Sequence, residues 1–289
     1  MFKKLIFAIF IATAWAQVRP PVGKDSLRFA VIGDTGTGDR AATRTAARLA
    51  EARGTFPFEF AVMMGDNIYG GESPRDYQRK FEAPYKALLD GGVKFYASLG
   101  NHDEPTQINY KNFNMNGQRY YTFRPRMGVR FFALDSNYVD ARQLSWLEDA
   151  LKQSGSEWKI CFFHHPLYSS GERHGPSLNT RAVLEPLFVK YQVSLVLTGH
   201  EHFYERMKPQ SGITYFIVGA SAKLRRDGIA RTDITAAGNA RDRSFVLMEI
   251  DGDQLHFQAI NQDLKVFDSG TIRRAVELRE TERSSATKQ

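Results

Sequence analysis

Cysteine is nearly absent from this 289-residue chain, in which Cys161 is the single thiol. One cysteine excludes an intramolecular disulfide, and an exported chain without disulfides fits a bacterial protein better than a eukaryotic secreted one. Cys161 lies in the apolar segment KICFF, where we expect it to be a small core residue.

Long hydrophobic runs are also scarce, and the clearest one begins near the N-terminus. Residues 1–16 combine a short basic start, the apolar stretch LIFAIFIATAWA, and small residues at Ala14 and Ala16. This pattern predicts a secretory signal peptide cleaved before Gln17, because the apolar stretch is short for a membrane span. An N-terminal membrane anchor is the alternative. We therefore expect an exported protein of bacterial type, periplasmic or secreted, without stable membrane association after cleavage.

Signatures of nucleic-acid and nucleotide binding are missing as well. The chain has no long Lys/Arg run with interleaved aromatic residues, so we expect no nucleic-acid partner. Its formal charge is +7, which falls to +5 if Lys3 and Lys4 leave with the signal peptide; this attracts anions without specifying a polynucleotide. The glycine-rich segment GDTGTG lacks the Lys-Ser/Thr of a P-loop and the full dinucleotide-binding spacing, which disfavours a phosphate loop.

From Leu27 onward, apolar strands alternate with helical stretches, which predicts an α/β sheet with helices on its faces. From about Ile213 the helical patterns stop, and strands joined by turns predict a mostly antiparallel later sheet. The expected helices lie within 40–54, 73–92 with a break at Pro84, 140–155 and 180–191. The expected segments are a signal peptide at 1–16, a lead-in at 17–26, one catalytic domain at 27–272, and a polar, disordered C-terminal tail at 273–289.

Polar side chains of metal-ligand type follow five of the predicted strands, at the point where each strand ends. Parallel strands would bring these ends together, and ligands of open α/β sheets bind beyond the carboxyl ends of the strands. Six of the seven histidines lie at or near these ends, whereas His256 lies within a strand and is expected to be structural. The five groups are Asp34, Asp66-Asn67, Asn101-His102-Asp103, His164-His165 and His200-Glu201-His202.

The His200-x-His202 pair suggests how such ligands would be shared. In an extended segment, residues two apart point to the same face, so both rings are predicted to face one pocket. Carboxylate, amide, phenolate and imidazole donors together fit Fe, Mn or Zn rather than copper. One carboxylate can bridge two cations. We therefore predict a two-metal site in which His200 and His202 hold different ions.

In this order, the motifs GDTG, GDNIY, GNHD, FFHH and GHEH resemble the metallophosphoesterase signature, in the version found in purple acid phosphatases. General metallophosphoesterases carry Asp-x-His in the first motif, whereas here Asp34 is followed by Gly36. Tyr69, three residues after Asp66, takes the place of the missing ligand, as in purple acid phosphatases. The match covers roughly residues 27–250 and resembles the small, single-domain, tartrate-resistant type. It implies a four-layer α/β/β/α sandwich of mixed sheets with helices on the outer faces.

The resemblance also implies a ligand set for the two metals. Ferric iron would occupy the first position, where the phenolate compensates its extra charge, and Fe(II), Zn or Mn would occupy the second. The first metal would be held by Asp34, Tyr69 and His202, the second by Asn101, His164 and His200, with Asp66 as the bridge.

The activity implied is hydrolysis of phosphate monoesters, as in an acid phosphatase, by direct attack of a metal-bound hydroxide on phosphorus. His102 and His174 are candidates to protonate the leaving alkoxide, although His174 could also be an ordinary loop histidine. Asp103 is expected to support His102 through a hydrogen bond. Candidate substrate-binding residues are His165, Lys223 and Arg225, and a solvated basic turn is the alternative for the last two.

Two other functions fit the same residues. The nearest is a phosphodiesterase or nucleotidase that uses the same two metals. The other, from a different class, is a binding scaffold that has kept the fold and lost catalysis. For the favoured function, the expected partner is a small phosphate ester, and the sequence specifies no oligomeric state.

Overall fold

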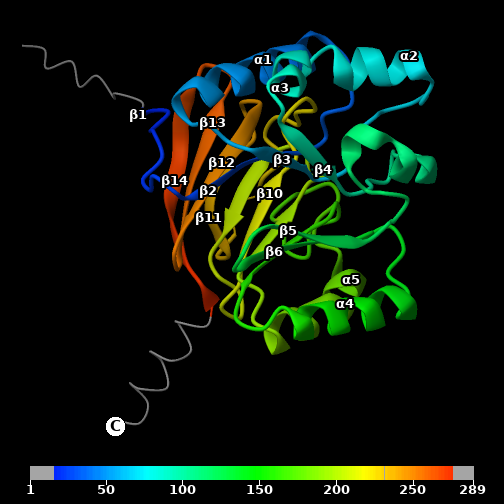
Figure 1. The fold of residues 1–289 in the computed structure, drawn as a ribbon, viewed down its shortest axis with the longest axis vertical. Coiled ribbons are helices and arrows are strands. Elements are labelled where there is room, and N and C mark those ends of the chain that lie inside the picture. Colours follow the sequence, from blue (N-terminus) through cyan, green and yellow to red (C-terminus); the bar gives the residue numbers. More distant parts are fainter. Residues whose placement is uncertain (1–15, 231, 276–289) are drawn as a thin grey trace, which may run out of the picture.

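Two seven-stranded β-sheets pack face to face between two outer layers of helices in the computed structural model (Figure 1). The structure describes residues 16–230 and 232–275. The predicted signal peptide, except for its last residue, and most of the predicted tail therefore lie outside the described residues. Within the described ranges, every helix is too short or too polar to span a bilayer.

The first sheet has a parallel centre flanked by antiparallel strands, in the order β1-β14-β13-β12-β2-β3-β4. Strands β2, β3 and β4 run parallel, and β12 pairs antiparallel with β2. The bounds are β1 Ala16–Gln17, β2 Leu27–Ile32, β3 Phe60–Met63, β4 Lys94–Ala97, β12 Ser244–Asp251, β13 Gln254–Asn261 and β14 Lys265–Arg273.

The second sheet is also mixed, in the order β11-β9-β10-β8-β7-β6-β5. Strands β6, β7, β8 and β10 run parallel, whereas β5, β9 and β11 pair antiparallel with their neighbours. The bounds are β5 Tyr121–Arg126, β6 Val129–Ala133, β7 Trp158–Phe162, β8 Leu195–Thr198, β9 Tyr204–Met207, β10 Thr214–Val218 and β11 Thr235–Asn239.

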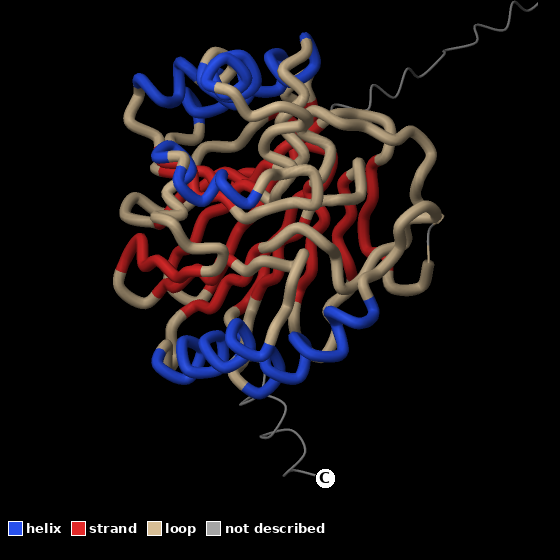
Figure 2. Tube along the Cα trace, turned by 90° about the vertical axis from the view of Figure 1, so that its right-hand side faces the viewer, coloured by secondary structure: helices blue, strands red, loops and turns tan. Residues whose placement is uncertain are grey.

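Helices cover the outer face of each sheet, so the molecule has four layers (Figure 2). On the first side lie α1 Arg40–Thr55, α2 Pro74–Tyr77, a π-helical turn Gln78–Glu82 and α3 Lys86–Asp90. On the second side lie α4 Ala141–Gln153 and α5 Leu178–Lys190. Short 3₁₀ turns at Pro105–Asn109 and Lys111–Phe113 lie in the loop after β4. The predicted cap Asp140 accepts a hydrogen bond from the Gln143 amide at the start of α4. The expected four-layer α/β/β/α fold is confirmed.

The buried core explains why the strands read as continuous apolar runs. Residues of β2, β3, β7 and β12 pack between the sheets, and Leu49 of α1 joins the same cluster. A second cluster fills the space between the second sheet and its helices, and it includes Leu147, Phe188 and Cys161. Cys161 is a buried free thiol, as predicted.

Three expectations about the elements were wrong or incomplete. The strands after Ile213 do not form one later sheet: β10 and β11 join the second sheet, whereas β12–β14 extend the first. The stretch 73–92 is divided into α2, a π-helical turn and α3. Strands β5, β9 and β11 were not anticipated; β5 carries Pro125, and β5 and β11 are the two edge strands of the second sheet.

The predicted lead-in segment is attached to the first sheet in the structure. The carboxylate of Glu249 accepts hydrogen bonds from the backbone amides of Val22 and Gly23, both at 2.8 Å. Strand β1 also pairs with β14, which ends at Arg273. Side-chain and ladder hydrogen bonds thus hold a polar, proline-containing segment that has little hydrophobic pattern of its own.

Candidate metal centre

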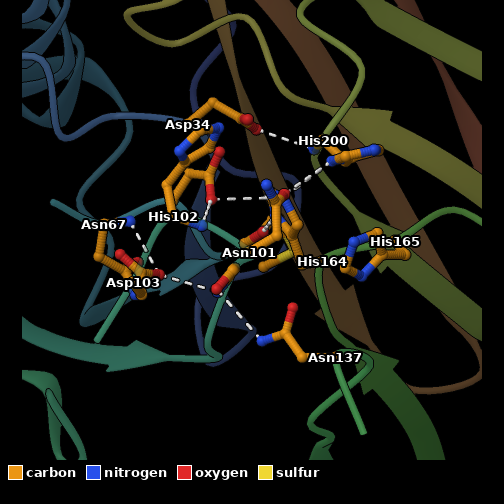
Figure 3. Close-up of polar contacts among 12 residues, drawn as sticks. Asp34, Asn67, Asn101, His102, Asp103, Asn137, His164, His165 and His200 are labelled. Atoms are coloured by element: carbon orange, nitrogen blue, oxygen red, sulfur yellow. Dashed lines mark hydrogen bonds and ion pairs between the residues drawn. The ribbon is translucent and has the colours of Figure 1, made fainter. Parts of the chain in front are cut away.

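The five predicted strand ends meet at one edge of the sandwich, although they belong to two sheets. Asp34, Asp66 and Asn101 follow β2, β3 and β4 of the first sheet, whereas His164 and His200 follow β7 and β8 of the second. In a single parallel sheet, which the sequence suggested, the carboxyl ends of the strands would lie in one row along the edge of the sheet. The two parallel centres instead face each other, so donors from both sheets converge on one site (Figure 3).

The first donor group contains Asp34, Asp66 and His202, whose potential ligand atoms all lie within 4.8 Å of one another. Nε2 of His202 lies 3.4 Å from Oδ1 of Asp34. The Tyr69 hydroxyl donates a hydrogen bond to the same Asp34 oxygen at 3.2 Å and lies 3.4 Å from Nε2 of His202. The structure therefore brings together the residues expected to hold the first metal.

The second donor group contains His164, His165 and His200, again with potential ligand atoms within 4.8 Å of one another. Oδ1 of Asn101 lies 2.9 Å from Nε2 of His164 and 3.0 Å from Nδ1 of His200. Oδ1 of Asp66 lies 3.4 Å from the same nitrogen of His164. Asp66 thus contacts both groups, which is the position that a bridging carboxylate requires.

Three of these residues have left-handed backbone conformations: φ is +54° at Asp34, +50° at Asp66 and +68° at His200. Such conformations cost about 1–3 kcal/mol each and persist where the surrounding structure enforces them. They turn the chain sharply as it leaves each strand. For His200 this corrects the extended His-x-His interpretation, because β8 ends at Thr198 and the bend sends the two rings to different groups.

Burial controls the protonation of the donors. Burial, and then the neighbouring Asp66 carboxylate, raises the pKa of Asp34 well above its ordinary value. Burial, and then the His164 ring, lowers the pKa of His200 to about 2, and burial followed by Arg225 lowers that of His202 to about 4. The imidazoles are therefore neutral with available lone pairs, and the close carboxylates gain from a cation between them.

The tautomer of His164 also suits a ligand. Its Nδ1 lies 2.8 Å from the carbonyl oxygen of Met64, which can only accept, so the proton is on Nδ1. The lone pair on Nε2 then points toward Asn101 and His200. A backbone carbonyl that orients the ring is the usual arrangement behind a metal-binding histidine, so the donor set fits a dinuclear centre.

Comparison with known proteins agrees with this geometry. Residues 27–204 match the model of the calcineurin-like phosphoesterase family. The chain belongs to this family. Relatives include tartrate-resistant acid phosphatase type 5 of Oryctolagus cuniculus, 28% identical over 258 residues that cover 75% of this chain and 78% of that protein. Purple acid phosphatase 5 of Arabidopsis thaliana is 29% identical over 226 residues, which cover 75% of this chain and 54% of the plant protein.

The fold also resembles that of a solved phosphatase. Purple acid phosphatase PPD1 from yellow lupin (Lupinus luteus) seeds superposes with a TM-score of 0.74 and 18% sequence identity, covering 87% of this chain and 54% of the lupin chain. At this identity the likeness shows the fold alone. The resemblance to metallophosphoesterases that the motifs indicated is therefore confirmed, and the site is that of a dinuclear-metal phosphoesterase.

Within this calcineurin-like phosphoesterase site, His102 and Asp103 are oriented differently from each other. The His102 ring packs against Tyr69 with 5.0 Å between ring centres, and its backbone amide donates to Asp66. Asp103 turns away from the predicted contact with the His102 ring. It accepts hydrogen bonds from Asn67 through both amide groups and from the Gly100 amide (Figure 3). The expected His102–Asp103 pair is wrong, because backbone donors of two loops capture the carboxylate.

His174 lies at the mouth of the site, beside the second donor group. Its ring centre is 4.4 Å from that of His200, and its Nε2 lies 3.3 Å from Nη2 of Arg225. Burial, and then the Arg225 guanidinium, lowers the pKa of His174. Arg225 in turn contacts the buried carboxylate of Glu201 at 3.3 Å. Arg225 therefore has fixed partners and is not part of a solvated turn.

Lys223 and His165 occupy opposite flanks of the centre. The Lys223 ammonium lies 4.5 Å from the centre of the Tyr69 ring, and its backbone amide donates to the Asp34 carbonyl. His165 belongs to the second donor group, while its Nδ1 lies 2.9 Å from the Ser136 hydroxyl. Both are therefore next to predicted metal ligands.

Several residues that shape the site were missed in the sequence. Lys80 is buried, and its ammonium donates to the carbonyl of Tyr69 at 2.7 Å and to that of Gly71 at 2.8 Å. The i,i+4 spacing of Asp76 and Lys80 was the available signal. Asp135-Ser136-Asn137 follows β6, and this sixth strand end has the same polar pattern as the five that were recognised.

Proposed function

We propose that this protein is an acid phosphatase that hydrolyses small phosphate monoesters at a dinuclear metal centre. The observation that carries the proposal is the pair of donor groups that share Asp66, one with Tyr69 and Asp34 and the other with Asn101 and His164. Two cations in these groups would supply Lewis-acid chemistry at phosphorus and stabilise the developing charge. The names of the relatives support the monoester choice.

We assign ferric iron to the group that contains Tyr69, and Fe(II), Zn or Mn to the group that contains Asn101. A phenolate is a hard anionic donor that suits a trivalent ion, and the second group offers neutral imidazole and amide donors. Burial, and then the Asp34 carboxylate, raises the pKa of the Tyr69 phenol, so only a strongly charged cation beside the oxygen would remove its proton.

Residues on the rim have roles in binding and in proton transfer. The Lys223 ammonium lies beside Tyr69 and the Arg225 guanidinium beside His174, where both would attract the phosphoryl oxygens. His102 and His174 are exposed, lie beside Tyr69 and His200 respectively, and are the candidates to protonate the leaving oxygen. The partner is then a small phosphate ester, and we infer export to the periplasm or the medium from the predicted signal peptide.

The test is turnover of an aryl phosphate and a bis-aryl phosphate by the purified, metal-replete protein. We expect the monoester to react faster, and Asp66→Asn to lower kcat/KM by at least about a thousandfold while reducing the bound metal. Asp90→Asn is the matched control, because this carboxylate is exposed and pairs only at the surface with Lys86.

Two outcomes contradict the proposal. Faster turnover of the diester would favour the phosphodiesterase or nucleotidase alternative with the same metals. Absence of activity in the wild type, with both metals bound, would favour the binding scaffold.

A further inference from the structure

A pocket of about 580 Å³ opens from the metal centre on the side of the second donor group. Asn101 and His165 line it beside the metal centre, and Tyr138, Asn179 and Thr180 are also among its lining residues. Figure 3 shows Asn137, another lining residue, below Asn101 with His165 at the side. Because the pocket is continuous with the metal ligands, a group attached to a phosphate bound there would extend into it.

The charge of this pocket disfavours a second anionic group on the substrate. Among the described residues that line it, Arg119 is the one with a permanent positive charge. Its Nε lies 3.2 Å from the buried Asp135 carboxylate and its Nη2 lies 3.9 Å from Asp140, so two carboxylates face this one cation. The Asp103 carboxylate also lines the wall. A nucleoside triphosphate or a bisphosphate would therefore meet more carboxylates than cations in this pocket.

The remaining lining suits a neutral group with many hydroxyls. Hydroxyl and amide side chains surround the pocket, and several of them already bond within the protein: Ser136 to His165, Asn137 to Gly100 and Ser177 to Thr180. The Asn179 amide is exposed and shows no side-chain hydrogen bond to another described residue, so it is available to a ligand. Tyr138 is 67% exposed, and the Arg119 guanidinium carbon lies 5.8 Å from the centre of its ring. The ring face away from Arg119 can pack against C–H groups while the hydroxyl binds a polar one.

We propose that this pocket binds the alcohol part of the substrate, and that this alcohol is a neutral polyhydroxy group such as a monosaccharide. The inference rests on the proposed phosphatase function and narrows its substrate class to sugar monophosphates. Tyr138 and Asn179 determine this specificity, whereas the phosphate binds at the metal centre. Inorganic phosphate has no alcohol part and therefore binds at the metal centre without contacting the pocket.

The experiment compares glucose 6-phosphate, fructose 1,6-bisphosphate and phenyl phosphate as substrates of the metal-replete protein. We expect the highest kcat/KM for the hexose monophosphate. Asn179→Ala should raise the KM for this substrate by about fivefold to tenfold, the effect of one lost hydrogen bond, with little change for phenyl phosphate. Tyr138→Ala should do the same, and Tyr138→Phe should retain most of the affinity. Asn112→Ala, an asparagine outside the pocket, is the matched control.

Inhibition by inorganic phosphate separates the pocket from the metal centre. Its inhibition constant should be the same in wild type, Tyr138→Ala and Asn179→Ala. Equal effects of the two variants on all three substrates, or a preference for the bisphosphate, would overturn the assignment of the pocket.

A binding measurement keeps the inference independent of turnover. If the wild type hydrolyses none of the esters, the proposed phosphatase function fails. Calorimetry then compares the affinities for glucose 6-phosphate and inorganic phosphate. If the wild type binds the sugar phosphate more tightly and Asn179→Ala removes this difference, the assignment of the pocket is supported. Equal affinities in the wild type reject it.

Discussion

The Tyr69 hydroxyl lies 3.2 Å from Oδ1 of Asp34, although the two residues belong to loops that follow different strands. Tyr69 lies in the loop after β3 and Asp34 in the loop after β2, and the parallel pairing of these strands brings the loops together. A phenol and a carboxylate at this distance form an anionic pair of donors once the phenol is deprotonated.

From this contact we predict that the oxidised, iron-loaded protein has a visible phenolate-to-iron charge-transfer band that Tyr69→Phe removes. Tyr77→Phe is the control, since the Tyr77 hydroxyl bonds to Glu72 and is not one of the metal donors. The absorption spectrum of both variants checks this. A colourless wild type that still hydrolyses phosphate esters would remove Tyr69 from the ligand set and favour redox-inert ions.

Asp34→Asn should stabilise the protein in the presence of a chelator. Because its folded-state pKa lies above the ordinary 3.8, the folded protein binds this proton more tightly than the unfolded chain. The stability of the wild type therefore falls as the pH rises from about 4 toward that folded-state pKa. An asparagine at this position has no carboxyl to titrate, so this loss of stability with rising pH disappears. Asparagine also tolerates the left-handed backbone found there.

We expect the free energy of unfolding of Asp34→Asn to exceed that of wild type by about 1–3 kcal/mol at pH 7, and by less at pH 4.5. Denaturant unfolding at both pH values measures the difference. With both metals bound the order should reverse, because a ligand has been lost. A pH-independent difference would contradict the role assigned to burial and to Asp66.

Lys80→Met should destabilise the protein by about 2–3 kcal/mol, because the buried ammonium holds the carbonyls of Tyr69 and Gly71. The loss should also weaken metal binding at Tyr69, which chelator-competition titration would detect. Lys86→Met is the matched control: the Lys86 side chain is 72% exposed and pairs with Asp90, so the expected change is below about 0.5 kcal/mol. Equal effects of the two variants would argue against this role of Lys80.

Arg225→Gln should raise the KM for phosphate esters about tenfold, because the guanidinium is held near His174 by the buried Glu201. Steady-state kinetics and the inhibition constant of inorganic phosphate should change together, since both report binding of the phosphoryl group. Arg226→Gln, the exposed neighbour, should leave both unchanged. A loss confined to kcat would indicate that Arg225 acts on His174 alone.

Much of the fold was accessible from the sequence because its strands are short apolar runs that end in polar residues. The four-layer sandwich was reached through the motif resemblance, whereas the pattern itself predicted an α/β sheet followed by a mostly antiparallel later sheet. Nothing local distinguishes β12 from β10, since both are buried runs. Their assignment to different sheets depends on which neighbours they pair with.

The predicted site, like the fold, was partly accessible from the sequence and partly dependent on the tertiary structure. Residue type and order along the chain specified Asp34, Asp66, Asn101 and His164, because each directly follows an apolar run and side-chain chemistry is local. The partners of Asp103 and Arg225 could not be predicted in this way. Their hydrogen-bonding groups lie on loops distant in sequence, and burial decides which of several possible partners captures each charge.

By itself, the sequence specified the candidate donor residues, their order along the chain and the metal chemistry that they would permit. Tertiary structure alone decided that the ends of two facing sheets share one site, and that left-handed turns at Asp34, Asp66 and His200 aim the donors inward. It also decided that a pocket lined by Tyr138 and Asn179 adjoins Asn101. The physical reason is that pairing, burial and backbone strain depend on the whole packed chain, whereas ligand chemistry depends on single side chains.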